Sequence, residues 1–245
     1  MSELKKVAQI LKNARHLTAF TGAGISAESG IPTFRGKGGI WDKYDPVILE
    51  IDYFRKNPEK AWPLIKDMFY NVIDIARPNP AHYVLAEWEK NGLLKAIITQ
   101  NIDNLHQKAG NKQVIEFHGN TRDLVCLQCG KITPVKEADM TQNPVTCPQC
   151  GGLLKPDFVF FGEPIPPQAY EQSLYHSRQA DVYLIIGTTG IIMPASLLPY
   201  EAKRNKAIIV EINLTPSNFT EQITDIFLQG KASDVLSRLN TLIRE

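Results

Sequence analysis

The sequence has 245 residues, enough for one large α/β domain or for a large domain with a small partner. Hydrophobic residues make up 43% and charged residues 22%, as in an ordinary soluble globular protein. The net charge of +1 gives no reason to expect direct nucleic-acid or membrane binding. No apolar run approaches the length of a membrane span.

The first fifteen residues carry apolar side chains at helical spacing, with Glu3 among them. A transit peptide can show a similar pattern. The acidic residue and the lack of a cleavage-like small-residue site favour a first packed helix instead. We therefore expect a cytoplasmic protein.

A glycine-rich turn follows an apolar run at residues 17–20 that is typical of a buried strand. Gly22, Gly24 and Ala27 give the spacing G-x-G-x-x-G/A, which suits a tight turn and close approach to a pyrophosphate. The turn opens into a short predicted helix whose first amides can hold a phosphate. A glycine-rich turn without a ligand is the alternative. Hydride transfer is not supported, because Asp42, which stands about 20 residues on, lies in a loop-like segment.

Strand-like and helix-like segments then alternate along the chain. The pattern predicts a Rossmann-like, doubly wound parallel sheet, whose ligands bind at the carboxyl ends of its strands. The predicted strands cover residues 17–20, 94–99, 114–117, 158–161, 182–186, 207–212 and 226–228. Two segments break the alternation and predict a smaller inserted unit. We expect the large domain at 1–36, 79–119 and 157–245, with a helical insert at 37–78 and a zinc-binding insert at 120–156.

The four cysteines form two Cys-x2-Cys pairs separated by 17 residues (130–146), which is the spacing of a structural zinc site. Four thiolates complete a tetrahedron and leave no open position for metal catalysis. Disulfides are the weaker alternative in a chain expected to be cytoplasmic. The predicted ligands are Cys126, Cys129, Cys147 and Cys150.

Polar residues crowd two further strand ends. Residues 100–103 read Gln-Asn-Ile-Asp, which can be a hydrogen-bonded turn in which Asp103 caps a helix, or a loop that holds an amide or a ribose. His118 follows the strand at 114–117, and histidine has the unperturbed pKa best suited to proton transfer near neutral pH. His16 and His176 fit a surface or structural role, and His82 and His106 fit packing within helices.

Several motifs in this order resemble the sirtuin family, the NAD-dependent protein lysine deacylases. The resemblance extends from about Val7 to Leu239. Its motifs are GAGISAESGIPTFR at 22–35, TQNIDNLHQKAG at 99–110, EFHG at 116–119, PDFVFFGE at 156–163, GTT at 187–189 and Asn213.

This resemblance implies roles for individual residues. His118 is the expected general base, and a zinc ion and NAD as co-substrate are expected. The expected NAD contacts are Gly22, Ala23, Gly24, Ala27, Phe34, Arg35, Gln100, Asn101, Ile102, Asp103, Gly187, Thr188, Thr189, Asn213 and Ala232. The expected contacts to an acylated-lysine peptide are Val159, Phe161, Gly162 and Ile192.

The implied reaction moves an acyl group from a protein lysine to ADP-ribose and releases nicotinamide. Alternatives are mono-ADP-ribosyl transfer, deacylation that prefers other acyl groups, and a module that senses NAD without turnover.

Thr33 departs from the aspartate of many members, and Thr189-Gly190 from the commoner Ser-Leu or Ser-Ser. The family's desuccinylases carry a Tyr-x-x-Arg pair after a tryptophan. By distance from Trp62, the residues assigned to these two positions are Asp67 and Phe69, which are two residues apart rather than three. Neither is a cation, so the sequence predicts a neutral, apolar acyl group.

Overall fold

The computed structural model describes residues 2–36 and 38–245. Met1 and Lys37, each the first residue of a predicted domain segment, lie outside the described residues. The larger part of the molecule is built on a six-stranded sheet in which every neighbouring pair of strands is parallel. In spatial order the strands are β3 (Val114–Glu116), β2 (Leu94–Thr99), β1 (Leu17–Thr21), β7 (Val182–Ile186), β8 (Ile208–Asn213) and β9 (Ile226–Gln229).

The strand order reverses between β1 and β7, so the chain runs outward from the middle of the sheet in both directions. This is the doubly wound Rossmann order, and it confirms the predicted fold class. Such a sheet opens a crevice at its switch point, outside the carboxyl ends of the two central strands. The turns that follow β1 and β7 therefore face the same space.

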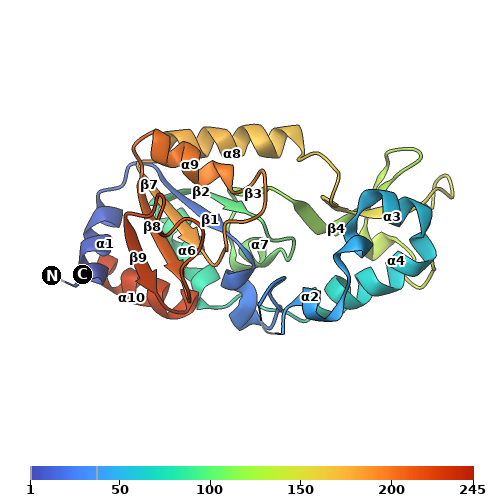
Figure 1. The fold of residues 1–245 in the computed structure, drawn as a ribbon, viewed down its shortest axis with the longest axis horizontal. Coiled ribbons are helices and arrows are strands. Elements are labelled where there is room, and N and C mark those ends of the chain that lie inside the picture. The colour runs from blue at the N-terminus through green and yellow to red at the C-terminus, as the bar shows by residue number, and fades with distance from the viewer. Residues whose placement is uncertain (1, 37) are drawn as a thin grey trace.

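Helices cover both faces of this sheet (Figure 1). One face buries side chains of α1 (Glu3–Lys12), α6 (Pro80–Lys90) and α10 (Ala232–Arg244), with Trp88 and Leu236 deep in the layer. The other face buries side chains of α8 (Pro167–Gln179) and α9 (Leu197–Arg204) against Phe20 and Tyr183. Helix α6 begins as predicted, because Asn79 Oδ1 accepts the Ala81 amide and proline occupies the first helical position.

A smaller unit forms the other end of the molecule (Figure 1). It contains a three-stranded antiparallel sheet in the order β5-β4-β6, made of β4 (Gly119–Cys126), β5 (Ile132–Pro134) and β6 (Leu154–Phe158). It also contains α2 (Ile40–Lys43), the 3-10 turn η2 (Pro46–Leu49), α3 (Ile51–Lys56), α4 (Pro58–Ile65), the π-helical turn η3 (Lys66–Tyr70), α5 (Asn71–Ile73) and the 3-10 turn η4 (Val135–Glu137). Both inserts share one hydrophobic core, and Trp62 Nε1 donates to Leu154 O at 3.1 Å across it.

One local prediction is wrong. The strand expected at 158–161 does not return to the large sheet: β6 ends at Phe158 inside the small sheet, and Phe161 makes a single bridge to Glu50. A short run of aromatic and branched residues suits a strand of either sheet. The sequence pattern therefore could not show which strand it would pair with. The short helix predicted after the first glycines is present as the 3-10 helix η1 (Ala23–Ser29). None of the helices in the described part of the chain is long and apolar enough to span a membrane.

Candidate active site and metal centre

The turns after β1 and β7, which border the crevice at the switch point, are in direct backbone contact. Gly24 N donates to Gly187 O at 2.8 Å, and Gly22 N donates to Ile186 O at 3.0 Å. A Cβ on Gly24 would lie 2.7 Å from Gly187 Cα, and one on Gly22 would lie 2.7 Å from Thr188 Cβ. These glycines are therefore required by the protein's own packing, before any ligand is considered.

The same contacts limit which amides can hold a phosphate. The amides of Gly22 and Gly24 are engaged within the protein, whereas that of Ala23 has no partner among residues 2–36 and 38–245. The sequence predicted several free amides at the start of this helix. Of the amides of Gly22, Ala23 and Gly24, that of Ala23 alone remains free for a phosphate within the described part of the chain. A phosphate here would need further donors from neighbouring strand ends.

Residues 100–103, at the end of β2, hold the glycine-rich turn in place. Asn101 Nδ2 donates to Gly22 O at 3.1 Å and to Ser26 Oγ at 3.2 Å. Asp103 accepts from Ser26 Oγ at 2.6 Å and from the Leu105 amide at 2.9 Å, which starts α7 (Leu105–Ala109). Burial raises the pKa of Asp103, and these two hydrogen bonds oppose that shift. The hydrogen-bonded turn expected at Asp103 is present, but Asp103 is not the N-cap of α7, which is Asn104. The same carboxylate also anchors the glycine-rich turn through Ser26.

Ser26 is a functional-site residue that sequence reasoning missed. Its side chain is completely buried between Asn101 and Asp103. It lies inside the glycine-rich motif, but a serine there gives no sign of its partner 77 residues away.

Gln100 and Asn213 approach the crevice from its two sides. Gln100 Nε2 donates to Thr188 Oγ1 at 3.1 Å, and Asn213 Nδ2 donates to Thr188 O at 2.9 Å. The loop after β7 is therefore tied to the ends of both β2 and β8. Thr189 is exposed, and its carbonyl accepts the Asn218 amide at 3.1 Å.

The remaining predicted cofactor residues differ in burial and in the element that carries them. Ala27 belongs to η1, Ala232 is the first residue of α10 and is buried, and Arg35 is exposed. Phe34 and Ile102 pack at the edge of the smaller unit's core.

His118 is fixed in one orientation at the end of β3. Its Nδ1 lies 3.1 Å from Gln100 O, and a carbonyl can only accept, so Nδ1 carries the proton. The other ring nitrogen, Nε2, is then the basic one. Burial lowers the pKa of His118, and the hydrogen bond to Gln100 opposes the shift. The imidazole is consequently neutral at pH 7 and can accept a proton.

The predicted peptide segment adjoins this histidine directly. Val159 N donates to His118 O at 2.9 Å, while Phe161 N donates to Leu49 O at 2.8 Å and Phe161 O accepts from Ile51 N at 3.0 Å. In the described part of the chain, neither the amide nor the carbonyl of Gly162 has a hydrogen-bond partner. The segment thus offers free backbone groups beside a base.

Aromatic contacts lead from Phe34, which follows the glycine-rich turn, to Phe161 of the peptide segment. Phe34 lies 5.4 Å from Trp41 and 6.3 Å from Phe69, centroid to centroid, and Trp41 lies 6.4 Å from Phe161. Phe161 is exposed at 43%, and Ile192 is partly buried on the loop after β7. These rings pack against one another and form an apolar surface next to the peptide segment.

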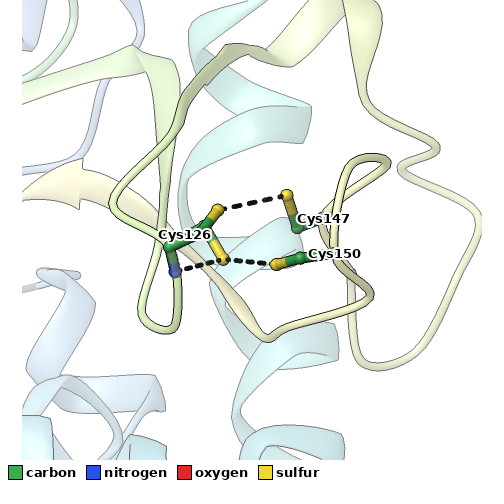
Figure 2. A group of neighbouring side chains, drawn as sticks. Cys126, Cys147 and Cys150 are labelled. Atoms are coloured by element: carbon green, nitrogen blue, oxygen red, sulfur yellow. Dashed lines mark hydrogen bonds between the residues drawn. The ribbon is translucent and has the colours of Figure 1, made fainter.

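The four cysteines converge at the end of the small sheet (Figure 2). The sulfurs of Cys126 and Cys150 are 3.6 Å apart, those of Cys129 and Cys147 are 3.9 Å apart, and all four lie within 4.8 Å of one another. With Zn–S bonds of about 2.3 Å, the sulfurs of a tetrahedral zinc site are separated by about 3.8 Å. The donor set and its spacing fit one zinc ion.

Comparison with known proteins agrees with this geometry. The sequence profile of the Sir2 family matches residues 22–194. The chain belongs to the Sir2 family. It is 46% identical to a protein of Pyrococcus furiosus named NAD-dependent protein deacylase, over 98% of each chain.

Solved Sir2 structures have the same fold. A Sir2 homologue mutant in complex with ADP-ribose has a TM-score of 0.93 and 40% identity, covering 100% of this chain and 97% of the other. A Sir2 with a deacetylated p53 peptide and 3′-O-acetyl ADP-ribose has a TM-score of 0.91 and 35% identity, covering 96% of each chain.

Proposed function

We propose that this Sir2 family protein removes acyl groups from protein lysine side chains with NAD as co-substrate. One water molecule is consumed, and the products are the free lysine, nicotinamide and O-acyl-ADP-ribose. The observation that carries the proposal is the position of His118. Its ring is held by a hydrogen bond to Gln100 O, among the residues that we assign to NAD. Its carbonyl accepts the amide of Val159, in the segment that we assign to the peptide. The relatives named NAD-dependent deacylases and the Sir2 bound to a deacetylated peptide support the same assignment.

The residues of the crevice suit NAD. Bound NAD would supply the bond to nicotinamide whose cleavage lets ADP-ribose accept the acyl group. The Ala23 amide, Gln100 and Asn213 provide hydrogen-bonding groups at three strand ends, and Asn101 and Asp103 fix the turn that carries Ala23. The other contacts that we assign to the co-substrate are Gly22, Gly24, Ala27, Phe34, Arg35, Ile102, Gly187, Thr188, Thr189 and Ala232.

His118 acts as the general base. Nε2 takes a proton from a hydroxyl that attacks the acyl group, while Nδ1–H stays bonded to Gln100 O and stabilises the charged ring. Because burial keeps the ring neutral at pH 7, it is ready to accept that proton. The aromatic rings around Phe34 exclude water from the step.

The acylated peptide binds as an added strand beside Val159–Gly162. Backbone pairing tolerates many side chains, which suits an enzyme that acts on proteins of differing sequence. The unpaired amide and carbonyl of Gly162, within the described residues, are the groups that we assign to this pairing. Ile192, on the facing loop, supplies an apolar contact to the acyl-lysine.

The zinc ion has a structural role in this proposal. Four cysteine ligands leave no position for a substrate, so the ion supplies folding free energy rather than chemistry. It joins the turn after β4 to the segment that leads into β6. Through β6, the zinc site supports the strand that ends next to the peptide segment.

The acyl group that this site accepts best is small and neutral. Asp67 is exposed and paired with Lys43 and Tyr44, and Phe69 is buried between Phe34 and Phe158, so neither offers a donor to a carboxylate. Two nearby cations are engaged elsewhere. Lys66 Nζ donates to Met140 O and Gln142 O, and Arg77 Nη1 donates to the carbonyls of residues 74–76.

The structure also corrects the helical spacing expected after Trp62. The helix widens into a π turn over Lys66–Tyr70, so α-helical spacing from Trp62 does not hold beyond Ile65. The tyrosine nearest to the Tyr-x-x-Arg pattern is Tyr70, which is buried, and Ile73 stands three residues later. An isoleucine there offers no cation, so the preference for a neutral acyl group follows with either spacing.

The test is the release of nicotinamide from NAD with and without an acetyl-lysine peptide. We expect release to require the acetylated peptide. Release at the same rate with the unacetylated peptide would contradict the proposal.

A further inference from the structure

Lys155 is a buried cation that the proposed chemistry does not use. It is 4% exposed, on strand β6. Its Nζ donates to Pro156 O at 2.8 Å and to Phe158 O at 2.6 Å, and it lies 3.0 Å from Glu163 Oε2. It also lies 4.5 Å from the centroid of the Phe160 ring. All three ammonium protons therefore have an acceptor.

Glu163 completes the arrangement from the other end of the loop. The same Oε2 that meets Lys155 accepts the Phe160 amide at 2.9 Å. The two side chains thus fix two carbonyls and one amide between residues 156 and 160. We call this arrangement the Lys155–Glu163 clamp.

The clamp encloses the segment to which we assign peptide binding. Val159, inside it, bonds to His118 O, and Phe161, next to it, bonds to Leu49 and Ile51. The segment is consequently held from three sides: by the base, by the helical insert and by the clamp. A shift of this backbone would move the free groups of Gly162 relative to His118.

We propose that Lys155 and Glu163 are positioning residues, which hold residues 158–162 in the geometry that binds an acylated peptide in register with His118. This inference rests on the proposed function. Neither side chain touches the reacting atoms.

Stability alone is a weak reason for a lysine at this position. Burial lowers the pKa of Lys155, and Glu163 opposes the shift, as expected for an ammonium kept in an apolar core. Buried ion pairs are often no more stabilising than apolar side chains of similar volume. What the lysine provides, and a methionine would not, is directed hydrogen bonds to two backbone carbonyls.

The experiment measures two affinities for each variant. A fluorescent acetyl-lysine peptide is titrated by anisotropy in the presence of ADP-ribose, and ADP-ribose itself is titrated by calorimetry. For Lys155→Met and for Glu163→Gln we expect the peptide Kd to rise about tenfold, as for the loss of a charged hydrogen bond, with the Kd of ADP-ribose within about twofold of wild type. Lys155→Arg keeps the charge and the donors, and we expect it to recover most of the peptide affinity.

The control is Lys203→Met, which breaks the ion pair of Lys203 with Asp225 on the surface of the large domain. It should change neither affinity. An unchanged peptide Kd in Glu163→Gln, the milder variant, would overturn the inference, as would a loss of peptide and ADP-ribose affinity in equal proportion. Wild-type turnover is measured in parallel. Peptide binding without turnover would contradict the proposed function. The ratios of variant to wild-type Kd would still show whether Lys155 and Glu163 position the peptide segment.

Discussion

Replacing Gly187 by alanine tests how the cofactor crevice is built. Gly187 has a φ of +62°, in the left-handed region that favours glycine. A Cβ there would lie 2.5 Å from Ile25 N and 2.6 Å from Gly24 C. Both contacts are to backbone atoms, which cannot rotate away as a side chain can. The two turns would have to separate.

The expected loss has two parts. A left-handed conformation costs a residue other than glycine about 1–2 kcal/mol. Overpacking a tight contact costs about 1–3 kcal/mol more. The free energy of unfolding should therefore fall by about 2–5 kcal/mol in Gly187→Ala, by the sum of these two terms. NAD affinity should also fall, because the separated turns carry the Ala23 amide and Thr188.

Gly92→Ala is the matched control. Gly92 has a φ of +78°, but nothing among the described residues lies within 4 Å of the position that a Cβ would take there. Only the conformational cost of about 1–2 kcal/mol applies, and NAD affinity should not change. Urea denaturation and calorimetric titration with NAD measure both quantities. If Gly187→Ala matched Gly92→Ala in stability and bound NAD like wild type, the reasoning from the close contact would be refuted.

Four further predictions concern the metal, the base, its titration and the acyl group. Cys126→Ala should lose its zinc and unfold the smaller unit, because structural zinc binding is itself folding free energy; one zinc per chain by atomic absorption with a normal melting curve would contradict this. His118→Ala should bind NAD like wild type but deacylate about 10²–10⁴-fold more slowly, a loss that single-turnover kinetics would detect or exclude. Burial lowers the pKa of His118 below its ordinary value of 6.5, so the base stays neutral as the pH falls to 6.5, and kcat/KM should decline only below that pH. A decline that begins at higher pH in the wild type and is absent in His118→Ala would contradict this prediction. Acetyl-lysine peptides should have a larger kcat/KM than succinyl or malonyl peptides of the same sequence, and the reverse order would point to an unforeseen partner for the carboxylate.

The large sheet could be predicted because its strands are buried on both faces and appear as short apolar runs. The strands β1, β2, β7 and β8 follow such runs, and a polar or glycine residue marks each carboxyl end. The cysteine spacing predicted a compact cluster for a similar reason, since each Cys-x2-Cys turn is local. In both cases the pattern that supports the prediction is formed by residues close together in the sequence.

Contacts between distant segments could not be predicted in this way. The sequence does not show that Gly24 packs on Gly187, nor that Ser26 bonds to Asp103. The peptide segment lies outside the sheet predicted for it, because an apolar run carries no information about its partner strand. The π turn at Lys66–Tyr70 changes the helical spacing, although it contains no proline or glycine itself and Pro63 lies before it in α4.

The central claim is that one crevice couples the cleavage of NAD to the removal of an acyl group from lysine. Mass spectrometry of a single reaction, with NAD and an acetyl-lysine peptide, tests it most directly. We predict equal amounts of nicotinamide, deacetylated peptide and O-acetyl-ADP-ribose. Free acetate as the first acyl product, or nicotinamide formed without deacetylated peptide, would contradict the account.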